Sequence, residues 1–283
     1  NLIYSGQAFE FQLRREYTES FLCKIRDLKE VDYLKDTTVQ FGTQQRTEKA
    51  SGFLLSMLSP VWRTKLCGEI GTSDGRTLLM DAEDETLFLK VVALGCGESV
   101  TMGEGLDELI RLARMADLYQ VEAIQGDVEE ALMDRLTVKS CGPILTTACG
   151  SGLMRLERAS RELALRKFDL LAECAGFVDL GEALLGSLLD DDALCSDSEE
   201  RVLEAVVRWM KTKGGGLRGE GLLRKIRFPL MATAYLADEA REMLPENAGL
   251  DELVLEACLL KHTGSHLWAG RRLRYLDARA LLP

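Results

Sequence analysis

Apolar positions along the chain predict mainly helices, with a few short strands near the beginning. Phe21, Ile25 and Leu28 follow i, i+4, i+7 spacing, which predicts a short helix with one narrow apolar stripe. Such a helix is marginal by itself, so we expect the stripe to pack on another surface. Residues 37–42 (TTVQFG) and 76–80 (RTLLM) are typical of short strands, and a polar turn is expected after the first of them.

Two consecutive apolar turns in residues 52–66 are separated by Ser59-Pro60. Proline breaks or kinks a helix in its interior, but it fits the first turn of a new helix, and serine is a favoured N-cap. We therefore predict a second helix that is capped by Ser59 and begins at Pro60. In that helix Trp62 and Leu66 should face the core, and the basic residues between them should face the solvent.

Helical spacing dominates the rest of the sequence. Apolar stripes at 87–94, 106–113 and 124–132 predict three helices, and the segment 118–121 separates the last two. After residue 137 nearly the whole chain has helical periodicity, in pieces of roughly 10–15 residues. The pattern predicts helices with a few short strands in the first half and an array of helices in the second.

Length and charge restrict the classes of partner. The 283 residues suffice for one large domain or two ordinary ones. A formal net charge of −11 argues against nucleic acid and anionic membranes as main partners. No run approaches the roughly 18 apolar residues of a membrane-spanning helix, and no basic segment followed by an apolar one opens the sequence.

Eight cysteines are scattered along the chain, and none forms a C-x-x-C pair. Most lie within apolar stretches. We therefore expect reduced, mostly buried thiols, as in a cytoplasmic or nuclear protein.

Few residues are spaced for metal binding. Cys258, His262 and His266 would share one face of a helix and could hold zinc, but a structural zinc site needs a fourth ligand and none is evident. The alternative is a helix end with two partly exposed histidines. We therefore assign no metal and no cofactor.

Three further segments allow either a ligand or an ordinary turn. Residues 71–77 (GTSDGRT) lack the lysine of a phosphate loop and precede a strand, and residues 214–221 (GGGLRGEG) follow a helix, so both are expected to be turns. Residues 190–192 (DDD) could bind a cation, but an acidic turn or a helix cap is the commoner role. Without a catalytic constellation, we predict that the protein is not an enzyme.

The motifs of the first half resemble those of the BTB (POZ) family. Residues 36–42 (DTTVQFG) resemble its opening strand DVTLVVG, and residues 50–66 (ASGFLLSMLSPVWRTKL) resemble its block AHKAVLAARSPYFRAMF. Residues 80–88 match its strand–helix step. Residues 109–124 (LIRLARMADLYQVEAI) match its helix pair LL-x-x-A-x-x-Y-Q-V-x-x-L.

The second half is similar to the BACK domain that follows BTB in BTB–Kelch proteins. Phe168, Phe177 and Leu180 stand at the family's NF…F…L positions. Residues 198–209 match SEE-x-V-F-x-A-V-x-x-W, and residues 227–236 match VRFPLL…YL. We expect Phe168 and the tryptophan that ends the second motif, Trp209, to be core residues.

The resemblance implies a mainly α chain of two domains. An α+β BTB domain with a short-stranded sheet would occupy 18–137, after an extension over 1–17, and an all-α BACK domain would occupy 138–248. A helical segment over 249–283 would lead to a substrate-binding domain such as a Kelch propeller, which either lies outside the sequence or is lacking. No propeller repeat is visible in the sequence.

The resemblance also implies a dimer, because BTB domains associate through an N-terminal helix. The partner would be a second copy of the chain or another BTB protein. The alternative is that the stripe of this helix packs on its own domain. The implied interface residues are Phe21, Leu22, Ile25, Leu28 and Asp36.

BTB–BACK proteins commonly bind a cullin scaffold, for which the resemblance implies contacts by Ile70, Thr72, Leu118 and Tyr119. Tyr119 could instead cap the helix pair. The family's contact loop usually reads apolar-x-Glu, and Thr72 stands where the glutamate is expected. A lost charge-assisted contact is worth roughly 1.5–3 kcal/mol.

Two functions follow as hypotheses. The first is a dimeric, non-catalytic substrate adaptor of a cullin-RING ubiquitin ligase, with a cullin and an unidentified substrate protein as partners. The alternative is a BTB–BACK scaffold or structural assembly subunit that binds no cullin, which Thr72 and the missing propeller favour. A metal- or nucleotide-dependent enzyme is a third alternative. The first two need neither nucleic acid nor membrane, and both fit the cytoplasm or the nucleus.

Overall fold

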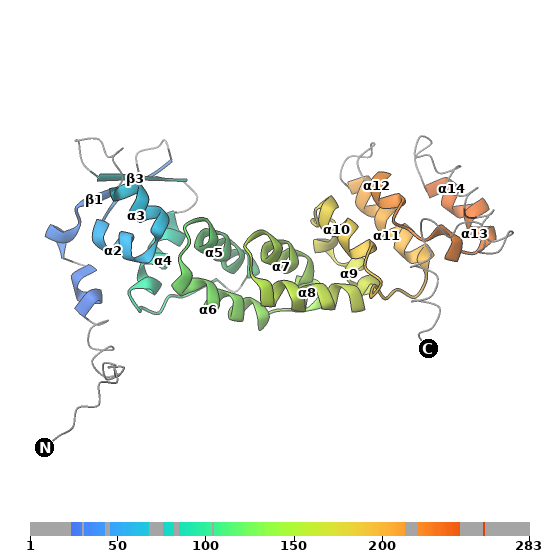
Figure 1. Cartoon of the computed structure of the whole chain (residues 1–283), viewed down its shortest axis with the longest axis horizontal. Coiled ribbons are helices and arrows are strands. Elements are labelled where there is room, and N and C mark those ends of the chain that lie inside the picture. Colours follow the sequence, from blue (N-terminus) through green and yellow to red (C-terminus); the bar gives the residue numbers. More distant parts are fainter. Residues whose placement is uncertain are drawn as a thin grey trace, which may run out of the picture. The chain divides into compact units, whose positions relative to one another are not determined.

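The computed structural model describes residues 24–29, 31–42, 46–67, 76–81, 85–103, 105–212, 220–243 and Ala257 (Figure 1). They form two compact units that divide between Val128 and Glu129. The described part of the chain is mainly helical with one small sheet, as predicted. No helix among these residues is long and apolar enough to cross a bilayer.

The first unit contains a three-stranded sheet in the order β2–β1–β3. β1 (Thr37–Phe41) pairs antiparallel with β2 (Arg46–Ala50) and parallel with β3 (Arg76–Met80). The strands predicted at 37–42 and 76–80 are confirmed. Gly42 begins a turn after β1, as expected, but the strand β2 that follows at residues 46–50 was not predicted. Every β2 residue is polar or small and none is fully buried, so the strand has no apolar alternation to reveal it.

The first unit also contains helices. Residues 24–29 are helical, and α2 (Gly52–Leu58) and α3 (Pro60–Cys67) follow β2. The other elements of this part are η1 (Asp32–Leu34), α4 (Glu85–Gly95), α5 (Leu106–Leu118) and α6 (Glu122–Met133), which crosses the division between the units. The helices predicted around 52–66, 87–94, 106–113 and 124–132 are confirmed, and α5 and α6 are separated within the predicted segment 118–121. The first predicted helix is described only over residues 24–29.

The joint between α2 and α3 forms as predicted. Ser59 has an extended backbone, with φ −139° and ψ 122°, and its Oγ accepts a hydrogen bond from the Trp62 amide at 3.0 Å. Pro60 takes the first position of α3, where a missing amide hydrogen costs nothing. Trp62 and Leu66 are buried, and the basic residues between them are exposed.

A row of aromatic side chains crosses the core of the first unit. The ring centroid of the fully buried Trp62 lies 5.5 Å from that of Phe88 and 5.2 Å from that of Tyr119. Phe41 of β1 lies 5.5 Å from Phe88 in an edge-to-face arrangement. Each such pair contributes about 0.5–1.5 kcal/mol beyond the burial of its surface. The row therefore ties the sheet to α3, to α4 and to the end of α5.

The regular elements described in the second unit are all helices, and its core gathers apolar side chains from α7 to α14 together with Ala257. Phe168 and Trp209 are both buried, as predicted. Trp209 Nε1 donates a hydrogen bond to the Leu180 carbonyl oxygen at 2.9 Å, so the buried indole is satisfied. The elements are α7 (Val138–Gly150), α8 (Met154–Arg166), α9 (Phe168–Glu173), η3 (Ala175–Phe177), α10 (Glu182–Leu189), α11 (Glu199–Thr212), α12 (Glu220–Leu223), η4 (Phe228–Leu230), α13 (Thr233–Ala237) and α14 (Glu239–Met243).

The acidic turn after α10 is a cluster of ion pairs. Each of its three carboxylates has a different basic partner, and the three partners come from α8 and from the segment that joins α12 to η4. The charges of the turn are therefore compensated within the protein, as expected for a structural turn and not for a cation site. The pairs are Asp190–Lys225, Asp191–Arg161 at 3.0 Å and Asp192–Arg227 at 3.5 Å.

Thiol burial differs from the expectation. Half of the described cysteines are exposed, so the prediction of mostly buried thiols is wrong for this part of the chain. The exposed ones lie in a loop or in the last turn of a helix, where apolar neighbours in the sequence do not guarantee burial. All six are free thiols: Cys67, Cys149 and Cys195 are exposed, Cys174 is half-buried, and Cys96 and Cys141 are buried.

Candidate protein–protein interface

Large apolar side chains are exposed on the first elements of the first unit. Leu28 lies in the helix 24–29, Tyr33 in η1, and Phe53 and Met57 in α2. Their exposed fractions are 44%, 83%, 70% and 52%. We call these four residues the apolar face. A contiguous exposed apolar patch marks an interaction site, whereas single exposed apolar residues are ordinary. Phe53 and Met57, four residues apart on α2, are neighbours on the surface of that helix.

The sequence of α2 explains why this helix is apolar on more than one side. Leu54 and Leu55 are buried, so they supply the contacts with the core. Phe53 and Met57 are four residues apart, which places them together on another side of the helix. A helix that is apolar nearly all round normally needs cover on all of it.

Polar contacts hold the elements of the apolar face in place. The Gly52 amide at the start of α2 donates to Asp36 Oδ1 at 2.7 Å. Arg26 donates to the Gly97 carbonyl oxygen at 2.8 Å, and Lys29 pairs with Glu98 at 2.5 Å. These contacts fix the helix 24–29 against the end of α4 and fix α2 against the start of β1.

The predicted dimer residues divide between described and undescribed parts. Leu28 belongs to the apolar face, Ile25 is half-buried, and Asp36 is exposed while its carboxylate caps α2. Phe21 and Leu22 lie outside the described residues. Sequence reasoning missed the other members of the apolar face. The signal for two of them was the run GFLLSML, which carries more apolar residues than one buried side of a helix requires.

Two of the predicted cullin contacts, Leu118 and Tyr119, are described, and they lie at the end of α5. Leu118 is 62% exposed, whereas Tyr119 is only 5% exposed. The Tyr119 ring packs on Trp62, and Lys65 Nζ lies 5.8 Å from its centroid. Leu118 is therefore the residue of this pair that can contact a partner directly. Ile70 and Thr72 lie outside the described residues.

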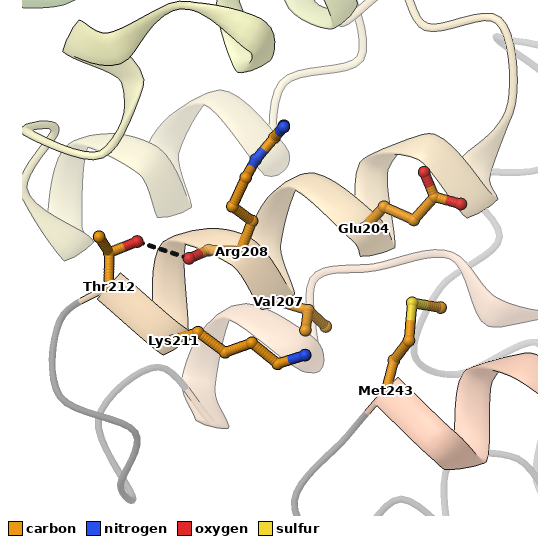
Figure 2. Close-up of a pocket in the computed structure, with 6 residues that line it drawn as sticks. All are labelled: Glu204, Val207, Arg208, Lys211, Thr212 and Met243. Atoms are coloured by element: carbon orange, nitrogen blue, oxygen red, sulfur yellow. Dashed lines mark hydrogen bonds between the residues drawn. The ribbon is translucent and has the colours of Figure 1, made fainter.

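The second unit has a shallow groove of about 530 Å³ between α11 and α14 (Figure 2). One carboxylate in its lining, that of Glu204, accepts a hydrogen bond from Tyr235 Oη at 3.3 Å. Burial, and then Glu204, raises the pKa of Tyr235. The lining residues of the groove are Glu204, Val207, Arg208, Lys211, Thr212 and Met243.

Within the described ranges, no group of three or more histidine, cysteine, aspartate or glutamate residues could hold a metal ion. Cys258, His262 and His266, which could share a helix face, lie outside those ranges. The described surface carries exposed leucine, methionine and aromatic side chains, on a chain of net negative charge.

Comparison with known proteins agrees with this architecture. The family model "BACK: BTB And C-terminal Kelch" matches residues 141–241. Kelch-like protein 41 of Homo sapiens is 23% identical over 234 residues, which cover 81% of this chain and 38% of that protein. Kelch-like protein 35 of Homo sapiens is 28% identical over 177 residues, covering 60% of this chain and 30% of that protein.

The name of a third relative includes both the Kelch repeat and the BTB domain. The Kelch repeat and BTB domain-containing protein 8 of Danio rerio is 25% identical over 188 residues, which cover 65% of this chain and 31% of that protein. The chain thus spans less than two-fifths of the length of these relatives. The matches extend well beyond residues 141–241, so they include the unit that contains the sheet. Residues 141–241 match the BACK family, and the similarity to Kelch-like proteins over most of the chain supports a BTB–BACK protein of the Kelch-like kind.

Proposed function

We propose that the protein is a dimeric, non-enzymatic adaptor that brings other proteins together, as a substrate adaptor of a cullin-RING ubiquitin ligase. The apolar face carries this proposal. Leu28, Phe53 and Met57 expose apolar surface on a unit that already has a well-packed core, so their exposure serves no purpose within the unit. The relationship to Kelch-like proteins supports the adaptor role, and an acidic surface fits protein partners better than nucleic acid.

The dimer is expected to use the apolar face of two copies. A two-fold axis would bring Phe53 and Met57 of one copy against the same surface of the other, because a symmetric dimer uses one patch twice. Burial of each large apolar side chain contributes roughly 1.5–3 kcal/mol. An aspartate in the middle of this surface would have to be buried without a partner, which prevents association.

Light scattering on the purified chain tests the dimer. We expect the parent to have twice the mass of one chain, and Phe53→Asp and Ile25→Asp to have the mass of one chain. Leu170→Asp is the matched control, because Leu170 is 52% exposed but lies in α9 of the second unit. A parent of single-chain mass, or a Phe53→Asp variant that remains dimeric, would contradict the proposed interface.

Cullin binding is expected to involve Leu118, which combines 62% exposure with a position at the end of α5. A pull-down with a purified cullin N-terminal domain tests this. The parent should bind at micromolar concentration, and Leu118→Asp should not. Thr72→Glu restores the carboxylate that the family pattern expects, so it should raise the affinity about tenfold, which corresponds to 1.4 kcal/mol.

The second candidate function is a BTB–BACK scaffold that dimerises but binds no cullin. Thr72 in place of a glutamate favours it, since that position would lose a charge-assisted contact. A dimeric parent that does not bind the cullin domain at micromolar concentration would select the scaffold. The substrate or client protein would then join through a part of the molecule other than the apolar face. Both functions fit the cytoplasm or the nucleus.

A further inference from the structure

Ser59 is a buried polar residue that joins two segments far apart in the sequence. It is 0% exposed. Its hydroxyl accepts from the Trp62 amide at 3.0 Å and donates to the carbonyl oxygen of Tyr119, sixty residues away. A serine hydroxyl has one hydrogen to donate, and Ser59 uses it on the end of α5.

The Tyr119 carbonyl lies where the chain turns from α5 into α6. Gln120 has φ +52°, the left-handed region that a residue with a side chain seldom adopts. The Val121 amide then donates to the Ala116 carbonyl oxygen at 2.7 Å and closes the turn. We call residues 118–121 the α5 corner. Leu118 and Gln120 are its exposed members, and Leu118 is the apolar one of the two. The direction of the Leu118 side chain depends on how the corner is held.

α3 contacts the α5 corner at three points. The Ser59 hydroxyl holds the Tyr119 carbonyl, the Trp62 ring lies 5.2 Å from the Tyr119 ring, and Lys65 Nζ lies 5.8 Å from that ring. Only the first contact is a directional bond to the backbone. The ring contacts can slide by a fraction of an ångström at little cost, whereas a hydrogen bond weakens steeply with its angle.

We propose that Ser59 is a positioning residue for partner binding: its hydroxyl fixes the α5 corner on α3, so that Leu118 is presented on a preformed surface. This inference rests on the proposed role of Leu118 in binding a cullin. A corner held in place before binding spares the partner the entropy of ordering it. Without the hydroxyl the same residues remain on the surface, but the complex must order them.

A purely local role for Ser59, as the N-cap of α3, predicts different behaviour, and one substitution separates the two roles. Glycine replaces serine at an N-cap at a cost of only a few tenths of a kcal/mol, and the extended backbone of Ser59 suits it. Ser59→Gly therefore removes the bond to Tyr119 while it largely keeps the start of α3. Ser56→Ala is the matched control, because Ser56 Oγ donates only to the Gly52 carbonyl oxygen of its own helix, at 2.6 Å.

The experiment is calorimetric titration of the full chain with a purified cullin N-terminal domain, at a temperature well below unfolding. We expect Ser59→Gly and Ser59→Ala to weaken binding about tenfold. Ser59→Thr, which keeps the hydroxyl, should recover most of the affinity, and Ser56→Ala should bind as the parent does. Equal affinities for Ser59→Gly and Ser56→Ala would overturn the proposal.

A double-mutant cycle with Leu118→Ala adds a measurement that a general loss of stability would not move. If Ser59 acts through Leu118, the effect of Ser59→Gly should largely disappear once Leu118 is truncated. Full additivity of the two effects would overturn the positioning role.

Hydrogen exchange distinguishes failure of this inference from failure of the proposed function. If the parent binds no cullin, the proposed function fails. The effect of the Ser59–Tyr119 hydrogen bond on the α5 corner can still be measured. Ser59→Gly should raise the exchange rate of the Val121 amide about tenfold and leave that of the Leu55 amide, bonded to the Ser51 carbonyl oxygen, nearly unchanged. An unchanged Val121 rate would overturn the proposal whether or not a cullin binds.

Discussion

Two glycines of the second unit approach each other so closely that neither has room for a side chain. A Cβ atom on Gly142 would lie 2.5 Å from the Gly176 carbonyl oxygen, and one on Gly176 would lie 2.8 Å from Pro143 Cδ. The backbones of α7 and η3 therefore touch. Because a backbone atom cannot rotate aside as the end of a side chain can, this contact sets the spacing of the two elements.

Gly142→Ala should lower the free energy of unfolding by about 1–3 kcal/mol, because overpacking outweighs the better helix propensity of alanine. Urea denaturation followed by circular dichroism measures the change. Gly150→Ala is the control in the same helix, since a Cβ there would meet nothing within 4 Å. It should change the stability by less than about 0.5 kcal/mol. Equal effects of the two substitutions would contradict the role of the contact.

Single residues were predictable where local chemistry decides their role. Ser59 at the start of α3 and Trp62 in the core follow from cap preference and helical spacing, which the sequence displays directly. The exposure of Phe53 and Met57 does not follow, because α2 is apolar on several sides and its period cannot say which side the core covers. That choice depends on packing with α4, which is distant in the sequence.

At the scale of elements, one ion pair organises the connection between α4 and α5. Lys90 donates to the Thr101 carbonyl oxygen at 2.7 Å and pairs with Glu108, while the Gly103 amide donates to Glu108 Oε2 at 2.5 Å. The bond from Gly103 and then that from Lys90 hold the pKa of Glu108 below its ordinary value. The Glu108 carboxylate of α5 thus binds both the connecting segment, at Gly103, and Lys90 of α4.

Glu108→Gln should lower the thermal midpoint at neutral pH, and the difference from the parent should shrink in acid. A carboxyl with a depressed folded-state pKa adds stability above its unfolded pKa of about 4.3 and loses it as the pH falls through the folded value. Calorimetry between neutral pH and about pH 3 measures this. A pH-independent difference for Glu108→Gln would contradict the role of this carboxylate in holding the connection.

Elements with an apolar period were predictable, and β2 was not. The strand pairs with β1 from Thr37↔Ala50 to Phe41↔Arg46 through backbone groups. Backbone pairing needs no apolar alternation, and an edge strand with one solvated side carries charged residues without penalty. The register between strands is set by their pairing in space, which a pattern within one segment cannot express.

At the scale of the whole molecule, association should stabilise the unit that carries the apolar face. A ligand that binds only the folded state stabilises it by about 2.7 kcal/mol at a hundred times its dissociation constant, and a second copy of the chain acts in the same way. Hydrogen exchange of the Leu55 amide in α2 should therefore slow as the protein concentration rises. Phe53→Asp should abolish this dependence, and a parent rate that is independent of concentration would argue against self-association.

The two-part organisation was visible in the sequence, because motif order and the change from mixed to purely helical periodicity both mark it. The division at residue 128 lies within α6, where the pattern shows no interruption. Because α6 is continuous across this point, no turn residues mark a boundary in the sequence. The grouping of side chains into separate cores is decided by packing between distant segments, which a pattern within one segment cannot express.

The ion pairs of the turn at 190–192 affect the electrostatic potential that a distant partner meets. Three carboxylates beside three cations form dipoles, and the potential of a dipole decays faster than that of a single charge. This turn therefore contributes little to the long-range potential of a chain whose formal net charge is −11. Glu122, Asp127 and Glu130 of α6 are exposed, so this helix attracts a basic partner at long range more strongly than the turn at 190–192 does.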